Sequence, residues 1–180
     1  MTDSVTQSGG LDSLIAAWIR DIPDYPKPGV VFKDITPLLG DGEAFRAVVG
    51  GLAAEHGDVD KVAGIEARGF ILAAPVACRL GAGFVPVRKK GKLPAATFSE
   101  DYELEYGTAT IEVHQDAFAP SDRVLIVDDV LATGGTARAT ADLVRRSGAT
   151  VAGIAVLIEL SFLDGRAKLP DLPVSALLAV

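Results

Sequence analysis

Cysteine is almost absent from this sequence, and Cys78 is the single example. One cysteine cannot form an internal disulfide, which excludes a disulfide-stapled domain and makes a reducing compartment the default expectation. Because Cys78 stands inside an apolar run, the sequence predicts a buried structural thiol. Histidine is also scarce, and neither His56 nor His114 has neighbours of the kind that form a metal site. We therefore expect both histidines to be structural or surface residues, and we predict no dedicated protein metal site.

The sequence also lacks any apolar run that approaches the ~20 residues of a membrane-spanning helix. Residues 1–10, MTDSVTQSGG, contain neither a basic nor an apolar section, so no signal peptide is visible. The formal net charge of −7 argues against nonspecific nucleic-acid binding as the main role. We expect a cytoplasmic protein with neither a membrane nor a nucleic acid as partner.

The pattern that is present alternates apolar runs with helical periodicity over 180 residues, a length that suits one domain. No internal repeat, low-complexity tract or linker marks a second domain. Strands are expected at 61–65, 84–87, 108–113, 124–127, 151–160 and 174–178. Helices are expected at about 12–20, 42–55, 69–80 and 135–147. This alternation predicts an α/β fold with a central, mainly parallel sheet and right-handed crossovers.

Two stretches do not fit this alternation. Residues 23–33, PDYPKPGVVFK, hold three prolines and a glycine, so they predict a stiff loop without regular helix. Residues 91–107 lose the apolar periodicity and predict a long mobile loop, a kind that usually has a function.

The most informative stretch is 123–136, RVLIVDDVLATGGT. Its apolar run predicts a strand buried on both faces of a parallel sheet. Ligands of such sheets bind at the carboxyl ends of the strands, which is where Asp128 and Asp129 are expected. The small-residue loop 132–136 precedes a helix and lets backbone N–H groups converge on an anion.

Two carboxylates beside a phosphate would repel it, unless they bind neutral hydroxyl groups or a metal. A vicinal diol close to a phosphate satisfies both halves of the stretch, and that group is a ribose 5-phosphate. No Gly-Lys-Ser/Thr follows, which excludes a Walker P-loop, and G-x-G-x-x-G is absent. Each piece alone also suits an ordinary acidic turn and helix cap, but the whole string favours ribose 5-phosphate.

VLIVDDVLATGGT resembles the 5-phosphoribosyl 1-diphosphate (PRPP) signature of the type I phosphoribosyltransferases. Four further blocks, in the same order, resemble the adenine phosphoribosyltransferases: PDYPKPGVVFKDITPLL, IEARGF, VRKKGKLP and YELEYG. The resemblance extends from about residue 19 to the end of the sequence. It implies a type I phosphoribosyltransferase fold in one domain, 1–180, with a small N-terminal hood at about 20–40 and a flexible loop at about 91–108. It also implies a homodimer of purine salvage that converts adenine and PRPP to AMP and pyrophosphate.

The resemblance assigns two groups of residues to PRPP. Its ribose and 5-phosphate are expected to bind Asp128, Asp129, Ala132, Thr133, Gly134, Gly135 and Thr136. Its pyrophosphate is expected to bind Glu66, Ala67, Arg68, Arg88 and Lys92. Read alone, the basic cluster at 88–92 also suits a solvated charged edge, and the loop at 66–69 suits an ordinary strand-to-helix connection. Family members often have a non-proline cis peptide in that loop, which here would be Glu66–Ala67.

The resemblance also implies the catalytic and base-binding residues. Glu105 and Arg68 are the expected catalytic residues, Glu105 handling a proton near the purine and Arg68 contacting the pyrophosphate, with Tyr106 in the same flexible loop as Glu105. Adenine is expected at Val31, Phe32, Lys33 and Leu131. Mg²⁺ is expected as a cofactor held mainly by the substrate's own oxygens and water.

Two other functions remain open at this point. One is a phosphoribosyltransferase for another purine base, and the other is a PRPP-sensing regulator without catalysis. A regulator would be expected to carry a basic nucleic-acid-binding extension and to tolerate loss of the loop glutamate. The sequence has no such extension and retains Glu105, which favours the enzyme.

Overall fold

The computed structural model describes residues 8–103 and 107–180. Two compact units make up the chain, residues 1–51 and residues 52–180. The sequence predicted a single domain without a linker, and the boundary between the units does fall inside a helix, α3 (Gly42–Ala53). The predicted hood at 20–40 lies within the first unit.

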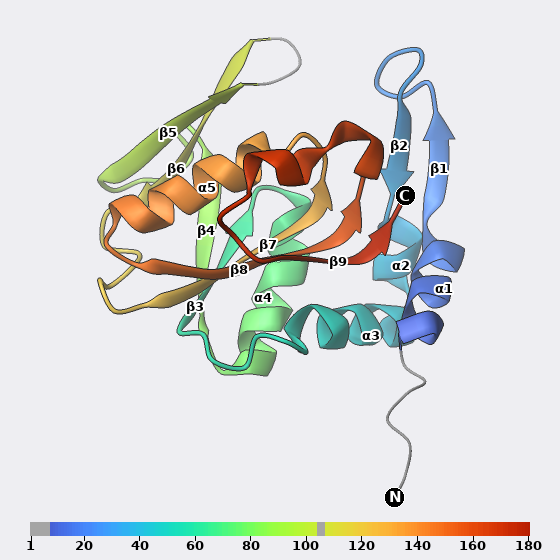
Figure 1. Cartoon of the computed structure of the whole chain (residues 1–180), viewed down its shortest axis with the longest axis horizontal. Coiled ribbons are helices and arrows are strands. Elements are labelled where there is room, and N and C mark those ends of the chain that lie inside the picture. The colour runs from blue at the N-terminus through green and yellow to red at the C-terminus, as the bar shows by residue number, and fades with distance from the viewer. Residues whose placement is uncertain (1–7, 104–106) are drawn as a thin grey trace, which may run out of the picture. The chain divides into compact units, whose positions relative to one another are not determined.

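The second unit is built on a seven-stranded sheet in the order β5-β6-β4-β3-β7-β8-β9 (Figure 1). The bounds are β3 (Lys61–Ile65), β4 (Gly83–Lys89), β5 (Thr97–Glu103), β6 (Thr108–His114), β7 (Arg123–Leu131), β8 (Thr150–Glu159) and β9 (Val174–Ala179). Strands β4, β3, β7, β8 and β9 are parallel, and β5 and β6 form an antiparallel edge. The α/β fold with a central, mainly parallel sheet is therefore confirmed.

Two helices connect the parallel strands. Helix α4 (Arg68–Leu80) leads from β3 to β4, and α5 (Gly135–Arg146) leads from β7 to β8 (Figure 1). The two connections run in opposite directions along the sheet, so right-handed crossovers put the helices on opposite faces. The strand order thus reverses between β3 and β7, and an open α/β sheet binds its ligands at such a point.

The core explains why the apolar runs become strands. Residues 124–127 of β7 are fully buried, as are Leu143 and Val144 of α5. Each such side chain contributes about 1.5–3 kcal/mol when it leaves water. Burial on both faces rewards a continuous apolar run, in contrast to the alternating pattern of a half-exposed strand.

Strand β7 is longer than predicted and includes both aspartates. Its pairing with β3 ends at Gly64 and Val127, whereas its pairing with β8 continues to Leu131 and Glu159. The last four residues of β7 therefore extend beyond β3, toward the loop that follows β3. This overhang places Asp128 and Asp129 at the carboxyl-end edge of the sheet, as predicted, although inside the strand.

The prediction of a loop over 91–107 is wrong for β5, which pairs with β6 along its whole length. The strand lies at the edge of the sheet, where polar side chains are tolerated and apolar alternation is weak. Helix α5 contacts β5 through Arg146. The Arg146 guanidinium lies 5.2 Å from the centre of the Phe98 ring and donates a hydrogen bond to the Ser99 carbonyl oxygen.

The first unit contains a two-stranded antiparallel ribbon, β1 with β2. The strands are β1 (Arg20–Pro23) and β2 (Val31–Asp34). The same unit also contains the helices α1 (Ser8–Trp18) and α2 (Thr36–Gly40). The stiff loop predicted at 23–33 is thus the turn of this ribbon together with the strand residues at its two ends. The Asp24 carboxylate accepts a hydrogen bond from the Gly29 N–H group and closes the turn.

Cys78 is exposed on α4, so the prediction of a buried thiol is wrong. The run around it is apolar on both faces of the helix, and such a run does not show which face is inside. Within the described ranges, no helix is long and apolar enough to cross a bilayer.

Candidate active site

A pocket of about 70 Å³ lies at the carboxyl end of β7. Its lining comprises Ile65, Asp128, Val130, Leu131, Ala132, Thr133, Gly134, Gly135, Thr136, Ala137, Ile154 and Val156. The structure thus brings together Asp128 and all five predicted residues of the loop 132–136. Asp129, the neighbour of Asp128 in the strand, is not part of the lining, because successive side chains of a strand point to opposite faces.

The loop 132–136 ends in the first turn of α5. Gly134 has φ of +77°, a left-handed conformation that a glycine adopts without strain. Among the described residues, no side chain caps the N–H groups at the start of α5, and the first turn of α5 contains no acidic residue. These N–H groups are left for an anion. Each hydrogen bond to a charged group contributes ~1.5–3 kcal/mol, against only ~0.3–1 kcal/mol from the helix dipole, so the N–H groups dominate.

Asp128 is the acidic group of this pocket. Its Oδ1 atom accepts a hydrogen bond of 2.8 Å from the Asp129 N–H group. Burial and the charge of Asp129 raise the pKa of Asp128 well above its usual range, and the opposing effects of that hydrogen bond and of Arg68 do not cancel the rise. A carboxyl group in this state is poised to share a proton or to accept hydrogen bonds from a diol.

Asp129 pairs with Arg68 across the point where the strand order reverses. The Asp129 Oδ2 atom lies 2.6 Å from Arg68 Nη2, and the Asp129 side chain is only 9% exposed. This contact is an ion pair without the alignment of a hydrogen bond. The ion pair links the first residue of α4 to the last part of β7.

A second ion pair organises the basic residues at the end of β4. The Glu66 Oε2 atom accepts hydrogen bonds of 3.1 Å from Arg88 Nε and from the Lys89 N–H group. Arg88 also donates to the Lys92 carbonyl oxygen. Burial raises the pKa of Glu66, but these contacts outweigh it and the net pKa is lowered. Glu66 therefore stays charged and orients Arg88. The Glu66–Ala67 peptide is cis, as the resemblance implied.

The remaining predicted residues either are not described by the structure or belong to the first unit. Glu105 and Tyr106 fall outside the described residues. Val31, Phe32 and Lys33 belong to β2 of the first unit. There Val31 is 49% exposed, the Phe32 ring packs edge-on against Tyr25 at 5.2 Å, and Lys33 Nζ lies 2.8 Å from Asp21 Oδ1.

Sequence reasoning missed two glycines at the site, where neighbouring atoms leave little room for a side chain. A Cβ atom on Gly69 would lie 2.8 Å from Asp128 Oδ1 and 3.1 Å from the Val127 carbonyl oxygen. A Cβ atom on Gly165 would collide with the carbonyl oxygen of Ala132. Gly69 stands in a block that already attracted notice, IEARGF, whereas nothing in the sequence around Gly165 marks its contact.

Similarity to known proteins decides the family. The phosphoribosyl transferase domain family matches residues 39–171. An adenine phosphoribosyltransferase from Thermobifida fusca is 62% identical over 175 residues, which cover 96% of this chain and 99% of the relative. This chain belongs to the adenine phosphoribosyltransferase family. The members of this family are pentosyl-transferring enzymes.

Solved structures of the adenine phosphoribosyltransferase family have the same fold. The enzyme from Rhodothermus marinus matches with a TM-score of 0.91 and 53% identity, over 96% of this chain and 99% of that one. The enzyme from Saccharomyces cerevisiae matches with a TM-score of 0.88 and 35% identity, over 94% and 99%. The yeast structure is a complex with an imino-altritol bisphosphate and adenine.

Proposed function

We propose that this chain transfers the 5-phosphoribosyl group of PRPP to adenine, which yields AMP and pyrophosphate in purine salvage. The pocket at the end of β7 carries the proposal, because a carboxyl group and uncapped helix N–H groups line one cavity. That combination suits a diol and a phosphate on one molecule. The choice of adenine is supported by the family and by the adenine bound to the yeast relative.

PRPP is assigned to the carboxyl ends of β3 and β7, the two strands between which the strand order reverses. The loop 132–136 takes the 5-phosphate, and Asp128 and Asp129 take the ribose hydroxyl groups. The pyrophosphate is assigned to the connection from β3 to α4 and to the end of β4 with the loop after it, through Glu66, Ala67, Arg68, Arg88 and Lys92. The Glu66–Arg88 and Arg68–Asp129 pairs support this assignment, because each pre-orients a guanidinium before substrate arrives.

The reaction displaces pyrophosphate from the anomeric carbon of the ribose. The bond between that carbon and the pyrophosphate oxygen breaks, and a bond to an adenine nitrogen forms. The transition state resembles an oxocarbenium ion, so no covalent nucleophile on the protein is needed. Arg68, Arg88 and Lys92 neutralise the departing charge. Glu105 accepts the proton that adenine loses.

Val31, Phe32, Lys33 and Leu131 are proposed as the adenine contacts, as the family resemblance implies, and Tyr106 as a residue of the flexible loop. Main-chain groups of Val31 and Lys33 read the amino edge of the base. The Asp21–Lys33 ion pair is consistent with that role, because the Lys33 side chain is engaged within its own ribbon.

Mg²⁺ is proposed as the cofactor that PRPP brings with it. Among the residues that the structure describes, no three His, Cys, Asp or Glu side chains gather into a metal site. The Asp128 and Asp129 carboxylates nevertheless suit an ion that keeps most of its ligands from phosphates and water. When bound, the ion would neutralise charge on the pyrophosphate.

A panel of bases tests the proposed function. Wild-type protein is incubated with PRPP and Mg²⁺, together with adenine, guanine, hypoxanthine or xanthine, and each nucleotide is quantified by chromatography. The expected result is AMP from adenine, at a kcat/KM at least about 10²-fold above those of the other bases, since a site that pairs polar edges rejects mismatches strongly. Preference for another base would favour a different phosphoribosyltransferase. PRPP binding without turnover of any base would favour the regulator.

We also propose that the chain acts as a cytoplasmic homodimer. Ile71 of α4 and Phe84 of β4 are large apolar side chains exposed by 45% and 38%, and a second copy would cover them. The exposed thiol of Cys78 is suited to a reducing compartment. Light scattering is expected to give twice the chain mass of 18.7 kDa for the wild type. Ile71→Glu is expected to shift the mass toward the monomer, and an unchanged mass would contradict this surface as the interface.

A further inference from the structure

The segment 160–172, which follows β8, has no role in the proposed chemistry. It nevertheless contacts the loop 132–136, to which the 5-phosphate is assigned and which we call the phosphate loop. It contains two short 3₁₀ turns, η1 (Ser161–Leu163) and η2 (Gly165–Lys168). Its Gly165 lies backbone-to-backbone against the loop 132–136. A Cβ on Gly134 would collide with the Gly165 carbonyl oxygen, and a Cβ on Gly165 would lie 3.1 Å from the Gly134 nitrogen. We call 160–172 the supporting segment.

Arg166 fixes the supporting segment next to that contact. Its Nε and Nη2 atoms donate hydrogen bonds of 2.7 Å to the two carboxylate oxygens of Glu159. Its Nη1 atom donates one of 2.8 Å to the Val174 carbonyl oxygen. Glu159 is the last residue of β8 and pairs in register with Leu131, the residue before the phosphate loop. Arg166 therefore sets where Gly165 lies relative to that loop.

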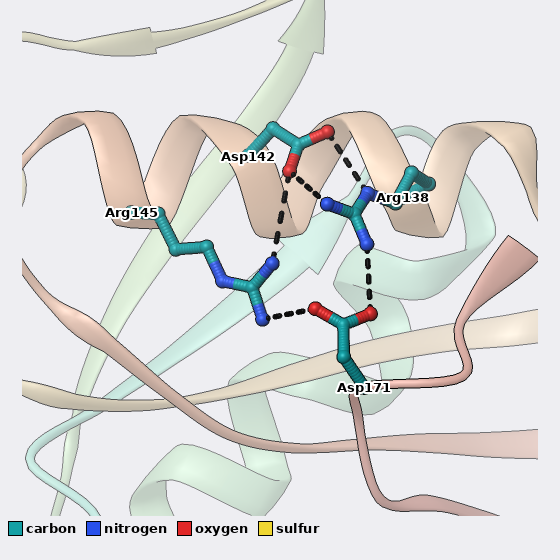
Figure 2. Close-up of polar contacts among 4 residues, drawn as sticks. All are labelled: Arg138, Asp142, Arg145 and Asp171. Carbon is teal, nitrogen blue, oxygen red and sulfur yellow. Dashed lines mark hydrogen bonds and ion pairs between the residues drawn. The ribbon is translucent and has the colours of Figure 1, made fainter.

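The far end of the supporting segment is tied to the helix that the phosphate loop opens. Figure 2 shows Asp171 between Arg138 and Arg145 of α5, at 2.8 Å and 2.7 Å. Arg138 also forms a two-pronged pair with Asp142, one turn further along the helix. The supporting segment is thus tied to the end of β8 at Arg166 and to α5 at Asp171, and Gly165 directly precedes the first of these contacts.

Arg166 has a second consequence for an anion nearby. Glu159 is buried, and its charge lies at the same sheet edge as the phosphate loop. An unpaired carboxylate there would repel a phosphate, whereas the two-pronged pair with Arg166 neutralises it.

We propose that Arg166 is a positioning residue for the 5-phosphate of PRPP, acting through Gly165 on the backbone of the loop 132–136. This inference rests on the proposed function, because it assumes that the loop binds that phosphate. Arg166 does not contact the substrate. It holds the backbone against which Gly134 adopts its left-handed turn, so that the N–H groups of the loop are aligned before the phosphate arrives.

The test compares Arg166→Ala and Arg166→Lys with Arg123→Ala. Arg123 is a matched control: it is an ion-paired arginine of similar exposure (54%, against 46% for Arg166), at the opposite end of β7. Ribose 5-phosphate affinity is measured by calorimetry, and KM for PRPP and kcat by AMP formation. Arg166→Ala is expected to weaken ribose 5-phosphate binding and to raise KM for PRPP, each about 10-fold or more. The kcat at saturating PRPP should change less than about 3-fold, as for loss of uniform binding.

Arg166→Lys keeps the charge but loses the planar fork, so we expect a partial recovery of affinity. Arg123→Ala is expected to match the wild type. Ribose 5-phosphate binding by Arg166→Ala that equals the wild type would overturn the proposal. A fall in kcat with unchanged KM would overturn it as well, because that pattern places Arg166 in the chemical step.

The double variant Glu159→Gln/Arg166→Ala separates position from charge. It removes the anchor without leaving a buried charge, so its ribose 5-phosphate affinity is expected to stay low. Full recovery would show that Arg166 acts only by neutralising Glu159 and would overturn the positioning role.

Calorimetry also separates this inference from the proposed function. Wild-type protein that binds ribose 5-phosphate but makes no AMP would remove the enzymatic function and leave the positioning role to be judged by the variants' binding. Wild-type protein that does not bind ribose 5-phosphate would overturn both.

Discussion

At the scale of single residues, the site depends on how two adjacent carboxyl groups share one guanidinium. Arg68 lies against Asp129, and the buried Asp128 is left with a raised pKa. Adjacent buried carboxylates cannot both be charged without cost. Ionisation of Asp128 therefore carries an electrostatic cost in the free protein, at the place where a ribose diol is proposed to bind, which is a usual compromise between stability and function.

Asp128→Asn is expected to stabilise the protein at neutral pH. Because the folded-state pKa of Asp128 lies above its ordinary value of 3.8, the group favours folding below that value and loses this contribution as the pH rises through the folded-state pKa. At pH 7 the asparagine removes the free-energy cost of ionising a buried carboxyl group beside Asp129. Tm is therefore expected to rise by about 2–4 °C, the effect of ~1 kcal/mol in a chain of this size.

Thermal unfolding at several pH values checks this expectation, since the gain should grow from pH 4 toward pH 7. The same variant is expected to bind PRPP more weakly. A Tm difference that does not vary with pH would contradict the raised pKa as its cause.

The residue types of the site were largely predictable from the sequence, but their pairing was not. The acidic pair and the small-residue loop are visible because side-chain chemistry leaves letters in the sequence. The contacts of Glu66 with Arg88 and of Arg68 with Asp129 depend on strand order, since they join strands that are distant in the chain but adjacent in the sheet.

At the scale of elements, the overhang of β7 beyond β3 makes the site. Asp128 and the start of α4 approach each other there so closely that a Cβ atom at position 69 would lie 2.8 Å from Asp128 Oδ1. The sequence predicted both elements, because long apolar runs and helical periodicity are strong signals. It missed β5 and the ribbon of the first unit, because edge strands with polar side chains and proline-bounded strands lack those signals.

Gly69→Ala is expected to destabilise the protein by about 1–3 kcal/mol, a usual cost of overpacking against backbone. It should also raise KM for PRPP, because the new methyl group displaces Asp128. Gly42→Ala is the matched control, since Gly42 also lies in the first turn of a helix but a Cβ there meets nothing within 4 Å. Chemical denaturation and PRPP titration measure both effects. Equal stabilities of the two variants would contradict the crowding at position 69.

At the scale of the whole molecule, the fold agrees with the one that the family resemblance implies. The α/β sheet was predictable because its parallel strands are buried on both faces. The support of the phosphate loop by the segment 160–172 was not, because contacts between backbones leave no side-chain signature. In that segment Gly165 lies against the backbone of Ala132 and Gly134, which are some thirty residues away in the chain by a rough count of the sequence.

The central claim is that the end of β7 binds PRPP, and backbone amide NMR tests it most directly. Labelled protein is titrated with PRPP and Mg²⁺, and chemical-shift changes are followed residue by residue. The account predicts saturable changes that are largest at the amides of residues 132–136, with a second group at Arg68 and the residues beside it. Saturable changes confined to other parts of the chain, with the amides of 132–136 unmoved, would contradict it.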